Sequence, residues 1–305
     1  MSKDIAKIRN KSVYLSEPYQ VPPSEIVGRD QEMTKILTAW MCGRSSLPLS
    51  PLLLGEPGVG KNRIVYECAK LCGKELYICP IGDEDTTAEE LVCTGRISDD
   101  LGKKMDYIAS PLVTAMLLGG VCFVDEIGKI GSKTLKSLAS LLDERRYVDS
   151  TLLGERVYAH RGFRFVAATN SDDLDQRPLE PSIDHRLRPK ITINHPNHEE
   201  IEQIVRGKFN GIIDNGADLL RCFWELWEKQ GGNRPPTPRD SLYIFGYATN
   251  LADFEATRGH LPYDLNQQVG AEVTEEHLVR AFEECKDSVG RKRNDHTTRN
   301  VPLAQ

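Results

Sequence analysis

The sequence predicts an α/β protein in which a parallel sheet lies between helices, followed by a small all-α domain. Mostly apolar runs at 51–54, 121–124 and 163–169 predict the sheet, because strands buried on both faces need continuous apolar sequence. Each run ends in glycine-rich or polar residues, as expected where parallel strands carry a binding site at their carboxyl ends. The all-α domain is predicted by apolar residues that recur at helical spacing after Pro196.

The first run continues into a glycine-rich loop with the chemistry of a phosphate site. Gly55, Gly60 and Lys61 match the pattern G-x-x-x-x-G-K, and a helix-compatible segment follows at 63–71. Glycines let consecutive backbone N–H groups face a triphosphate, the helix N-terminus adds positive charge, and the lysine reaches the β- and γ-phosphates. The alternative is a chance glycine-rich turn. The residues predicted to bind nucleotide here are Gly55, Glu56, Pro57, Gly58, Val59, Gly60, Lys61, Asn62 and Arg63.

Asn62 departs from the pattern, which has Ser or Thr at this position to bind Mg²⁺ through a hydroxyl. An amide oxygen is also a ligand for Mg²⁺, but it is neutral and lies further from the backbone than a serine hydroxyl. The loop therefore predicts nucleotide binding, whereas Asn62 leaves the rate of metal-assisted hydrolysis open.

Polar residues end the next two runs. Asp125 and Glu126 follow the run at 121–124, and Asn170 follows the run at 163–169. We expect Asp125 to bind Mg²⁺, directly or through water, together with Asn62. We expect Glu126 to accept a proton from the attacking water and Asn170 to orient water near the γ-phosphate. Taken singly, a solvated turn at Asp125 and a turn cap at Asn170 are the alternatives.

In this order, the motifs resemble those of the AAA+ ATPases. The segment 26–32 is similar to the family's segment that lines the adenine pocket, so the resemblance implies that Ile26 and Val27 contact the base. The resemblance covers about 26–287, nearly the whole chain. It implies the family's fold, a P-loop parallel sheet sandwiched by helices and followed by a small helical lid domain.

Three segments point to the MoxR-like and midasin–dynein-related branch of that family. The segment 85–96 looks like the branch's region leading into an insert in helix 2, and 110–121 looks like its approach to the Asp-Glu strand. Thr237-Pro238-Arg239 resembles the branch's second-sensor motif, so the resemblance implies that Arg239 is the second sensor and Asn170 the first.

The resemblance also implies an arginine finger at Arg186, in Asp184-His185-Arg186-Leu187, with Arg188 as the alternative. A finger acts on nucleotide held by the neighbouring subunit, so it implies a ring, and the family's rings imply a hexamer. For Arg186 the other interpretation is a surface arginine at a helix end. For Arg239 it is an arginine that packs within its own domain.

We expect four parts along the chain. Residues 1–24 contain three prolines and are predicted to form an extended arm, and 25–195 form the α/β nucleotide-binding domain. A hairpin at 147–161 is expected inside this domain, projecting toward a central pore in related rings. The helical lid takes 196–288, and 289–305 is a basic tail for which disorder is favoured over a nucleic-acid contact.

Composition excludes several classes of protein. The 305 residues are 39% hydrophobic, enough for a core, and the net charge of −6 argues against a surface that coats nucleic acid. No apolar stretch follows Met1, so we expect no signal peptide and a cytoplasmic location. The uncharged run 107–124 is broken by Pro111 and Gly119-Gly120, so we expect core rather than membrane insertion. The eight cysteines lack metal-type spacing, and free thiols are expected.

Together these features predict a MoxR-like AAA+ ATPase that uses ATP and Mg²⁺ at subunit interfaces of a ring to remodel or activate a protein client. The resemblance implies a partner with a von Willebrand A-type domain. One alternative is a nucleotide-gated assembly module with weak hydrolysis, and Asn62 is the reason to consider it. Another is a nucleic-acid-associated ring, suggested by Lys103-Lys104, Arg145-Arg146 and the basic tail, and disfavoured by the acidic balance.

Overall fold

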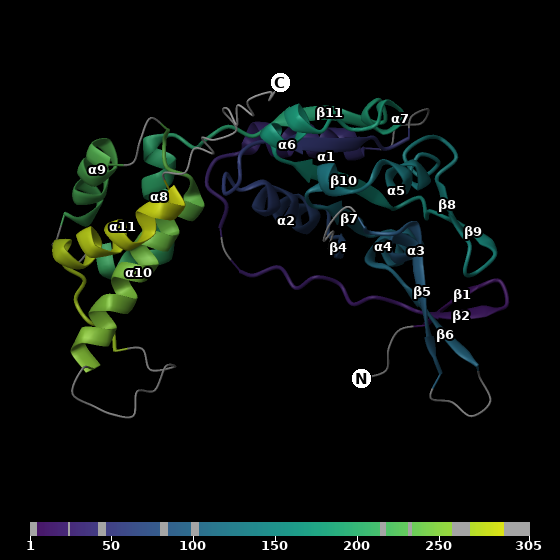
Figure 1. Cartoon of the computed structure of the whole chain (residues 1–305), viewed down its shortest axis with the longest axis horizontal. Coiled ribbons are helices and arrows are strands. Elements are labelled where there is room, and N and C mark those ends of the chain that lie inside the picture. Colours follow the sequence, from purple (N-terminus) through teal and green to yellow (C-terminus); the bar gives the residue numbers. More distant parts are fainter. Residues whose placement is uncertain are drawn as a thin grey trace, which may run out of the picture. The chain divides into compact units, whose positions relative to one another are not determined.

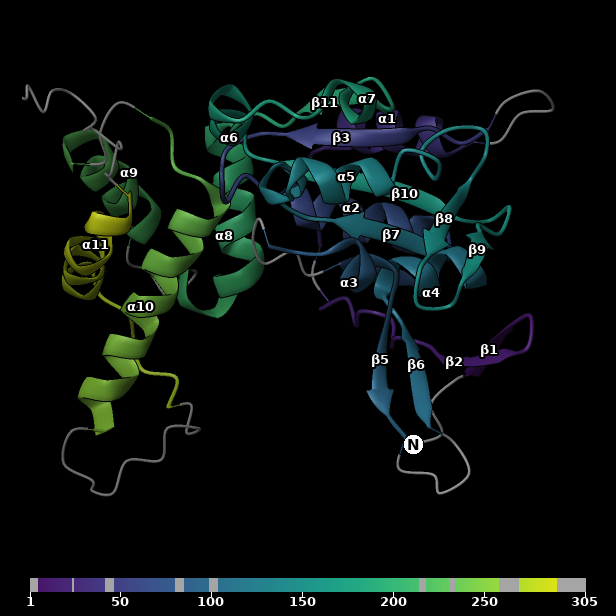
Figure 2. The same ribbon diagram turned by 45° about the vertical axis from the view of Figure 1, so that its right-hand side comes forward.

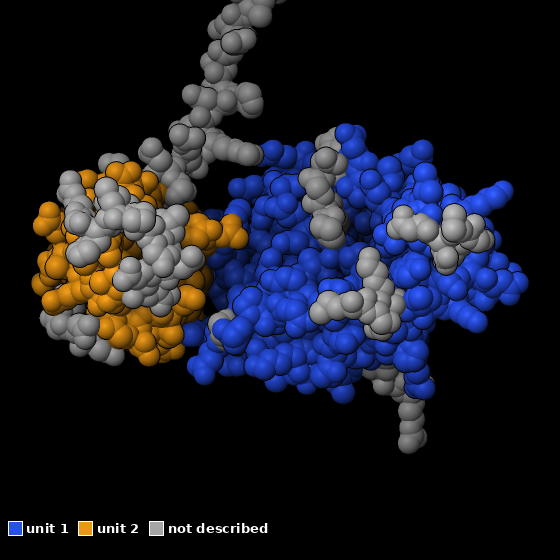
Figure 3. Space-filling model, turned by 90° about the horizontal axis from the view of Figure 1, so that it is seen from below, with its two compact units in different colours: residues 1–194 blue, residues 195–305 orange. Residues whose placement is uncertain are grey.

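The computed structural model describes residues 5–23, 25–41, 47–79, 85–98, 104–213, 218–230, 234–257 and 269–289. The chain divides into two compact units, Met1–Asn194 and His195–Gln305, which Figure 3 colours blue and orange. The division falls one residue before the domain boundary expected between 195 and 196.

The first unit is built on a parallel sheet (Figure 1). Its strands are β3 (Ser50–Leu54), β4 (Leu76–Cys79), β7 (Val121–Val124), β10 (Arg164–Thr169) and β11 (Leu187–Thr192). The order across the sheet is β11-β3-β10-β7-β4, and every neighbouring pair is parallel. Because β3, β10 and β7 are neighbouring parallel strands, the loops that follow them lie at the same end of the sheet.

The sheet has a hydrophobic core on each face, which explains the continuous apolar runs. Along β7, Cys122 and Val124 belong to one core, whereas Val121 and Phe123 belong to the other. The core that includes Val121 and Phe123 also includes residues of α1 (Asp30–Trp40) and α2 (Lys61–Leu71). The core that includes Cys122 and Val124 includes residues of four helices that Figure 2 labels. They are α3 (Ala88–Val92), α4 (Pro111–Leu118), α5 (Ser132–Ser137) and α7 (Pro181–Asp184). The predicted sandwich of helices and sheet is confirmed.

The N-terminal segment differs from the expected extended arm. β1 (Ile5–Ile8) and β2 (Lys11–Tyr14) form an antiparallel hairpin, and β2 pairs in parallel with β6 (Met105–Ala109), which pairs with β5 (Cys93–Ile97). Among the described residues of this segment, 15–23 is the longest stretch with neither helix nor strand. The prolines in that stretch suggested an arm throughout, and the partner strand β6 is too distant in sequence for a local pattern to reveal it.

A hairpin and two short helices are further elements of the first unit. The expected hairpin is formed by β8 (Tyr147–Ser150) and β9 (Glu155–Tyr158). After β7 the chain makes the short 3-10 helix η1 (Ile127–Lys129), and after β10 it makes α6 (Ser171–Gln176). These short helices fix the directions in which the chain leaves the carboxyl ends of the two strands.

The described residues of the second unit form helices around a core of their own. They are α8 (His198–Ile213), α9 (Leu219–Gln230), α10 (Pro238–Thr257) and α11 (Glu275–Val289). Phe223, Phe245 and Phe282 lie at the centre of this core with almost no exposure. The small helical lid expected from the sequence is therefore present. Most of the expected basic tail, 290–305, lies outside the described residues.

Two expectations about the chain as a whole can be compared with the described residues. None of their helices is long and apolar enough to cross a membrane. Their cysteines are free thiols, including Cys79 and Cys122, whose sulfur atoms lie 3.5 Å apart on neighbouring strands. Burial raises the pKa of Cys68 to about 12 and raises that of Cys122 as well, so these thiols stay protonated and unreactive.

Candidate nucleotide-binding site

The glycine-rich loop joins β3 to α2, as the sequence predicts. Gly58 and Gly60 have φ values of 88° and 101°, in the left-handed region that glycine adopts without a steric penalty. Gly55 is required for a different reason, because a Cβ atom there would lie 2.6 Å from the backbone oxygen of Ile193. Gly60 is the N-cap of α2, so the backbone N–H groups at the start of that helix face the loop.

Lys61 is buried, with 7% of its surface exposed, and oxygen atoms surround its charge. Its Nζ donates to the backbone oxygens of Gly55 at 2.7 Å and Glu56 at 3.0 Å, and to Oδ1 of Asn170 at 2.9 Å. Nδ2 of Asn170 donates to Asp173 at 2.9 Å, which fixes which end of the amide faces the lysine. The structure thus joins the phosphate loop directly to the residue that ends β10.

Asn62 and Asp125 are also brought together. Nδ2 of Asn62 donates to Oδ2 of Asp125 at 3.0 Å, and the backbone N–H of Glu126 donates to the other oxygen, Oδ1, at 3.0 Å. A carboxylate beside an amide supplies the hard oxygen ligands that Mg²⁺ prefers, and phosphate oxygens and water ordinarily complete its six positions. The donor set of Asn62 and Asp125 therefore fits Mg²⁺ bound with a nucleotide.

Glu126 follows Asp125 in a strained backbone conformation, with φ 56° and ψ 38°. A non-glycine residue in the left-handed region is uncommon, and such residues cluster at functional sites. Its carboxylate pairs with Lys129 of η1 at 2.6 Å, and both side chains are about half exposed. The hydrogen bond with Glu126 raises the pKa of Lys129, so the lysine is charged at neutral pH.

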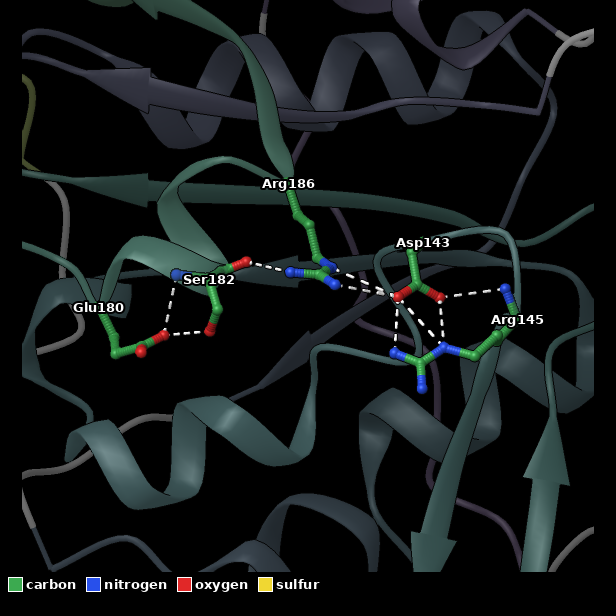
Figure 4. Close-up of polar contacts among 5 residues, drawn as sticks. All are labelled: Asp143, Arg145, Glu180, Ser182 and Arg186. Atoms are coloured by element: carbon green, nitrogen blue, oxygen red, sulfur yellow. Dashed lines mark hydrogen bonds and ion pairs between the residues drawn. The ribbon is translucent and has the colours of Figure 1, made fainter.

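Arg186 lies just after α7, and its guanidinium is hydrogen-bonded to two residues (Figure 4). Its Nε and Nη2 each donate to Oδ2 of Asp143 at 3.3 Å, and its Nη1 donates to the backbone oxygen of Ser182 at 2.5 Å. Asp143 is shared with Arg145, whose Nη2 lies 2.7 Å from the same oxygen. The hydrogen bond from Arg145 is the largest cause, and that from Arg186 a smaller one, of a pKa lowered to about 2 at Asp143.

The alternative finger, Arg188, and the predicted second sensor, Arg239, are both exposed. Arg188 pairs with Asp184 at 3.7 Å, and 44% of its side chain is exposed. Arg239 is exposed in the first turn of α10, between Thr237 and Asp240, whose side chains each accept from the other's backbone N–H group in a capping pair. Because Arg239 belongs to the second unit, its role as second sensor stays a prediction.

The segment predicted to line an adenine pocket lies beside the phosphate loop. Ile26 and Val27 are half-buried, and Ile26 packs against the core that contains α1 and α2. Arg29 ties this segment down, because its Nη2 donates to the backbone oxygens of Val59 at 3.3 Å and Asn194 at 2.9 Å. Sequence reasoning assigned Arg29 no role of its own, and its only signal was its place in the segment 26–32.

Two further residues, which the sequence did not indicate as part of the site, contact predicted site residues. Lys129 pairs with Glu126 three positions earlier, a spacing at which helical neighbours meet. Asp143 holds Arg186 from 43 positions away, so no local pattern points to it. The first of these contacts could have been found from the sequence, whereas the second depends on tertiary structure.

These features define a P-loop nucleotide-binding protein with a helical lid. A phosphate loop follows β3, carboxylates follow β7 and an amide follows β10. Residues 50–187 match the family described as AAA domain (dynein-related subfamily). Protein CbbQ of Hydrogenophilus thermoluteolus is 31% identical over 200 residues, which cover 65% of this chain and 68% of that protein. The chain belongs to the AAA+ ATPases, in the MoxR-like, dynein-related branch.

Other comparisons cover different shares of the molecule. Protein NorQ of Paracoccus denitrificans is 33% identical over 140 residues, 46% of this chain and 50% of that protein. The FIGL-1 AAA domain, solved in complex with ADP, superposes with a TM-score of 0.55 at 19% identity, covering 90% of this chain and 87% of that one. NtrX of Brucella abortus gives 0.52 at 16% identity, covering 75% and 49%. At such identities the solved structures establish the fold alone, and the match spans half of NorQ.

Proposed function

We propose that this chain binds ATP with Mg²⁺ and hydrolyses it at the site formed by β3, β7 and β10. Two hydrogen bonds carry the proposal. At the start of α2, Lys61 donates to Asn170, which follows β10, and Asn62 donates to Asp125, which follows β7. Phosphate oxygens can take the place of the backbone and amide oxygens around Nζ of Lys61 and form charge-assisted hydrogen bonds with it.

The residues divide the chemical work in the following way. Lys61 and the backbone N–H groups at the start of α2 hold the phosphates. Asn62 and Asp125 would hold Mg²⁺, which supplies positive charge that neutralises charge developing on the phosphate oxygens. Glu126 accepts the proton of the attacking water, and it must first leave its ion pair with Lys129. Asn170 orients that water, since its amide already faces the phosphate-binding lysine.

We further propose that the site is completed by a second copy of the chain. Arg186 keeps two N–H hydrogens beyond the three that bond Asp143 and Ser182, because a guanidinium carries five donors. These hydrogens suit a phosphate presented by a neighbouring subunit in a ring, for which a hexamer is the working assumption. We also propose a cytoplasmic ring that remodels or activates a protein client, with a von Willebrand A-type partner.

A nucleotide-gated assembly module with weak hydrolysis is the second candidate. Two observations favour it: Asn62 replaces the usual hydroxyl, and the carboxylate of Glu126 is occupied by Lys129 at 2.6 Å. In this function, ATP binding rather than turnover would control ring formation.

Steady-state ATPase activity measured across protein concentration, with native mass determined on the same samples, tests the proposal. We expect Mg²⁺-dependent activity per subunit to rise as rings form. Rings that bind ATP without measurable turnover would support the assembly module instead. A protein that remains monomeric with ATP and shows concentration-independent activity would overturn the ring.

A further inference from the structure

The carboxylate of Asp143 has two effects on Arg186 that oppose each other. It orders the guanidinium, because two guanidinium nitrogens lie 3.3 Å from Oδ2 of Asp143. The same negative charge weakens the attraction between Arg186 and a phosphate, and it also repels the phosphate. An arginine that is to act on phosphate from this position therefore needs a second cation at Asp143, which offsets the charge of the carboxylate.

Arg145 supplies that cation (Figure 4). Its Nη2 donates to Oδ2 of Asp143 at 2.7 Å, and its Nε donates to Oδ1 at 3.0 Å and to Oδ2 at 3.2 Å. Arg145 thus contacts both carboxylate oxygens, whereas Arg186 contacts only Oδ2 and at a greater distance. Because a short contact with both oxygens is the stronger arrangement, the charge of Asp143 is offset mainly by Arg145.

The contact between Arg145 and Asp143 is built into the local chain. The backbone N–H of Arg145 donates to Oδ1 of Asp143 at 3.0 Å, so the carboxylate binds both the backbone and the side chain of the residue two positions later. The Arg145 guanidinium also lies 6.0 Å from the centroid of the Tyr147 ring in β8. The turn therefore holds Arg145 on Asp143 without any contribution from Arg186.

The three groups form a cluster with a net charge of +1, because two guanidiniums share one carboxylate. Asp143 is the most buried of them, with 14% of its side chain exposed, against 31% for Arg186 and 48% for Arg145. Solvent therefore screens the charge of Asp143 least. Without Arg145, this carboxylate would be left with Arg186 as its cation, and the excess positive charge of the cluster would be lost.

We propose that Arg145 is a positioning residue for Arg186, which neutralises Asp143 so that the carboxylate orders the finger without cancelling its charge. Arg145 stays bound to the carboxylate when Arg186 turns its N–H groups toward a phosphate. This inference rests on the proposed function, because it assumes that Arg186 acts on nucleotide held by a neighbouring subunit. It gives Arg145 a role in the reaction without contact with the nucleotide.

Arg145→Gln tests the inference, because it removes the charge and keeps a side chain that can donate a hydrogen bond. ATP turnover and ATP binding are measured on samples in which native mass shows rings. We expect unchanged nucleotide affinity and a loss of about tenfold in turnover, a small part of the roughly 10³- to 10⁵-fold that a finger contributes. Arg156→Gln is the matched control and should keep native turnover, since Arg156 lies over the same Tyr147 ring at 4.7 Å but pairs with Asp149.

A second background separates this role from general damage and from direct contact between Arg145 and phosphate. In Asp143→Asn there is no charge to neutralise, and the amide oxygen can still accept from Arg186. Adding Arg145→Gln to this variant should therefore change turnover by less than about twofold. An equal loss in both backgrounds, no loss in the native one, or an Asp143→Asn variant as inactive as Arg186→Ala would overturn the inference. Native turnover in Arg186→Ala, or a native protein that forms no rings with ATP, would instead overturn the proposed function on which the inference rests.

Discussion

Arg186 and Asp143 form an ion pair inside a single chain, in which two guanidinium nitrogens lie 3.3 Å from the same carboxylate oxygen (Figure 4). The pair joins the end of α7 to the loop before β8, and Arg145 binds the same carboxylate. A guanidinium fixed in this way has lost most of its side-chain freedom before any neighbour arrives. If Arg186 acts across an interface, part of the entropic cost of ordering it has therefore already been met.

Asp143→Asn should make folding stability less dependent on acid pH. The native pKa of Asp143, about 2, lies below its ordinary value of 3.8. The charged carboxylate therefore stabilises the fold above about pH 4, and this contribution is lost as the pH falls through 2. We expect the variant to melt about 2–4 °C below the native protein at pH 7, and the gap to narrow between pH 4 and 2. Thermal unfolding followed by circular dichroism measures this, and a constant gap would contradict it.

Mixing two inactive variants should restore activity if Arg186 acts in trans. Arg186→Ala removes the finger and Lys61→Ala removes the phosphate contact, so each variant alone should lose most of its ATPase activity. In mixed rings, some interfaces pair an intact finger with an intact phosphate loop. Arg188→Ala, which breaks only the exposed pair with Asp184, is the control and should be milder.

The assay for this prediction is ATP turnover across mixing ratios at constant total protein. Lys61→Ala should also weaken ATP binding in a direct binding measurement, since Lys61 is expected to contact the phosphates. Mixtures that stay as inactive as their components, although native mass shows mixed rings, would rule out the action of Arg186 across an interface.

Much of the site was predictable because each of its parts is local in sequence. The phosphate loop, the carboxylates after β7 and Asn170 each end an apolar run, and parallel pairing places such ends at one edge. The pairing of the N-terminal hairpin with β6 and the capture of Arg186 by Asp143 were not predictable, because they join segments far apart in the chain.

Glu126→Gln should separate ATP binding from hydrolysis. The amide keeps the size of the side chain but cannot accept the proton, so turnover should fall by about 10²-fold or more while binding persists. The same change weakens the ion pair with Lys129. Lys129→Met is therefore the control, since it breaks the pair and leaves the carboxylate. Single-turnover hydrolysis and nucleotide binding are the measurements, and a native rate in Glu126→Gln would remove its role as general base.

Thr169→Val should stabilise the first unit. The hydroxyl of Thr169 is fully buried and has no hydrogen-bond partner in the described part of the chain. Valine has nearly the same shape and removes the unsatisfied oxygen, so we expect a gain of about 1 kcal/mol in the free energy of unfolding. Urea denaturation measures the change, and a loss of stability would indicate that the hydroxyl is bonded in solution, for instance to a buried water.

Asn62→Thr should lower the Mg²⁺ concentration needed for half-maximal turnover, or raise turnover itself. A hydroxyl ligand lies nearer the backbone than the Asn62 amide, and unlike that amide it has no NH₂ group that must be kept away from the metal. ATPase activity across a Mg²⁺ titration, with binding in EDTA as the control for folding, measures the effect. A slower enzyme with the same nucleotide affinity would show that the amide is a fitted ligand whose longer reach the site requires.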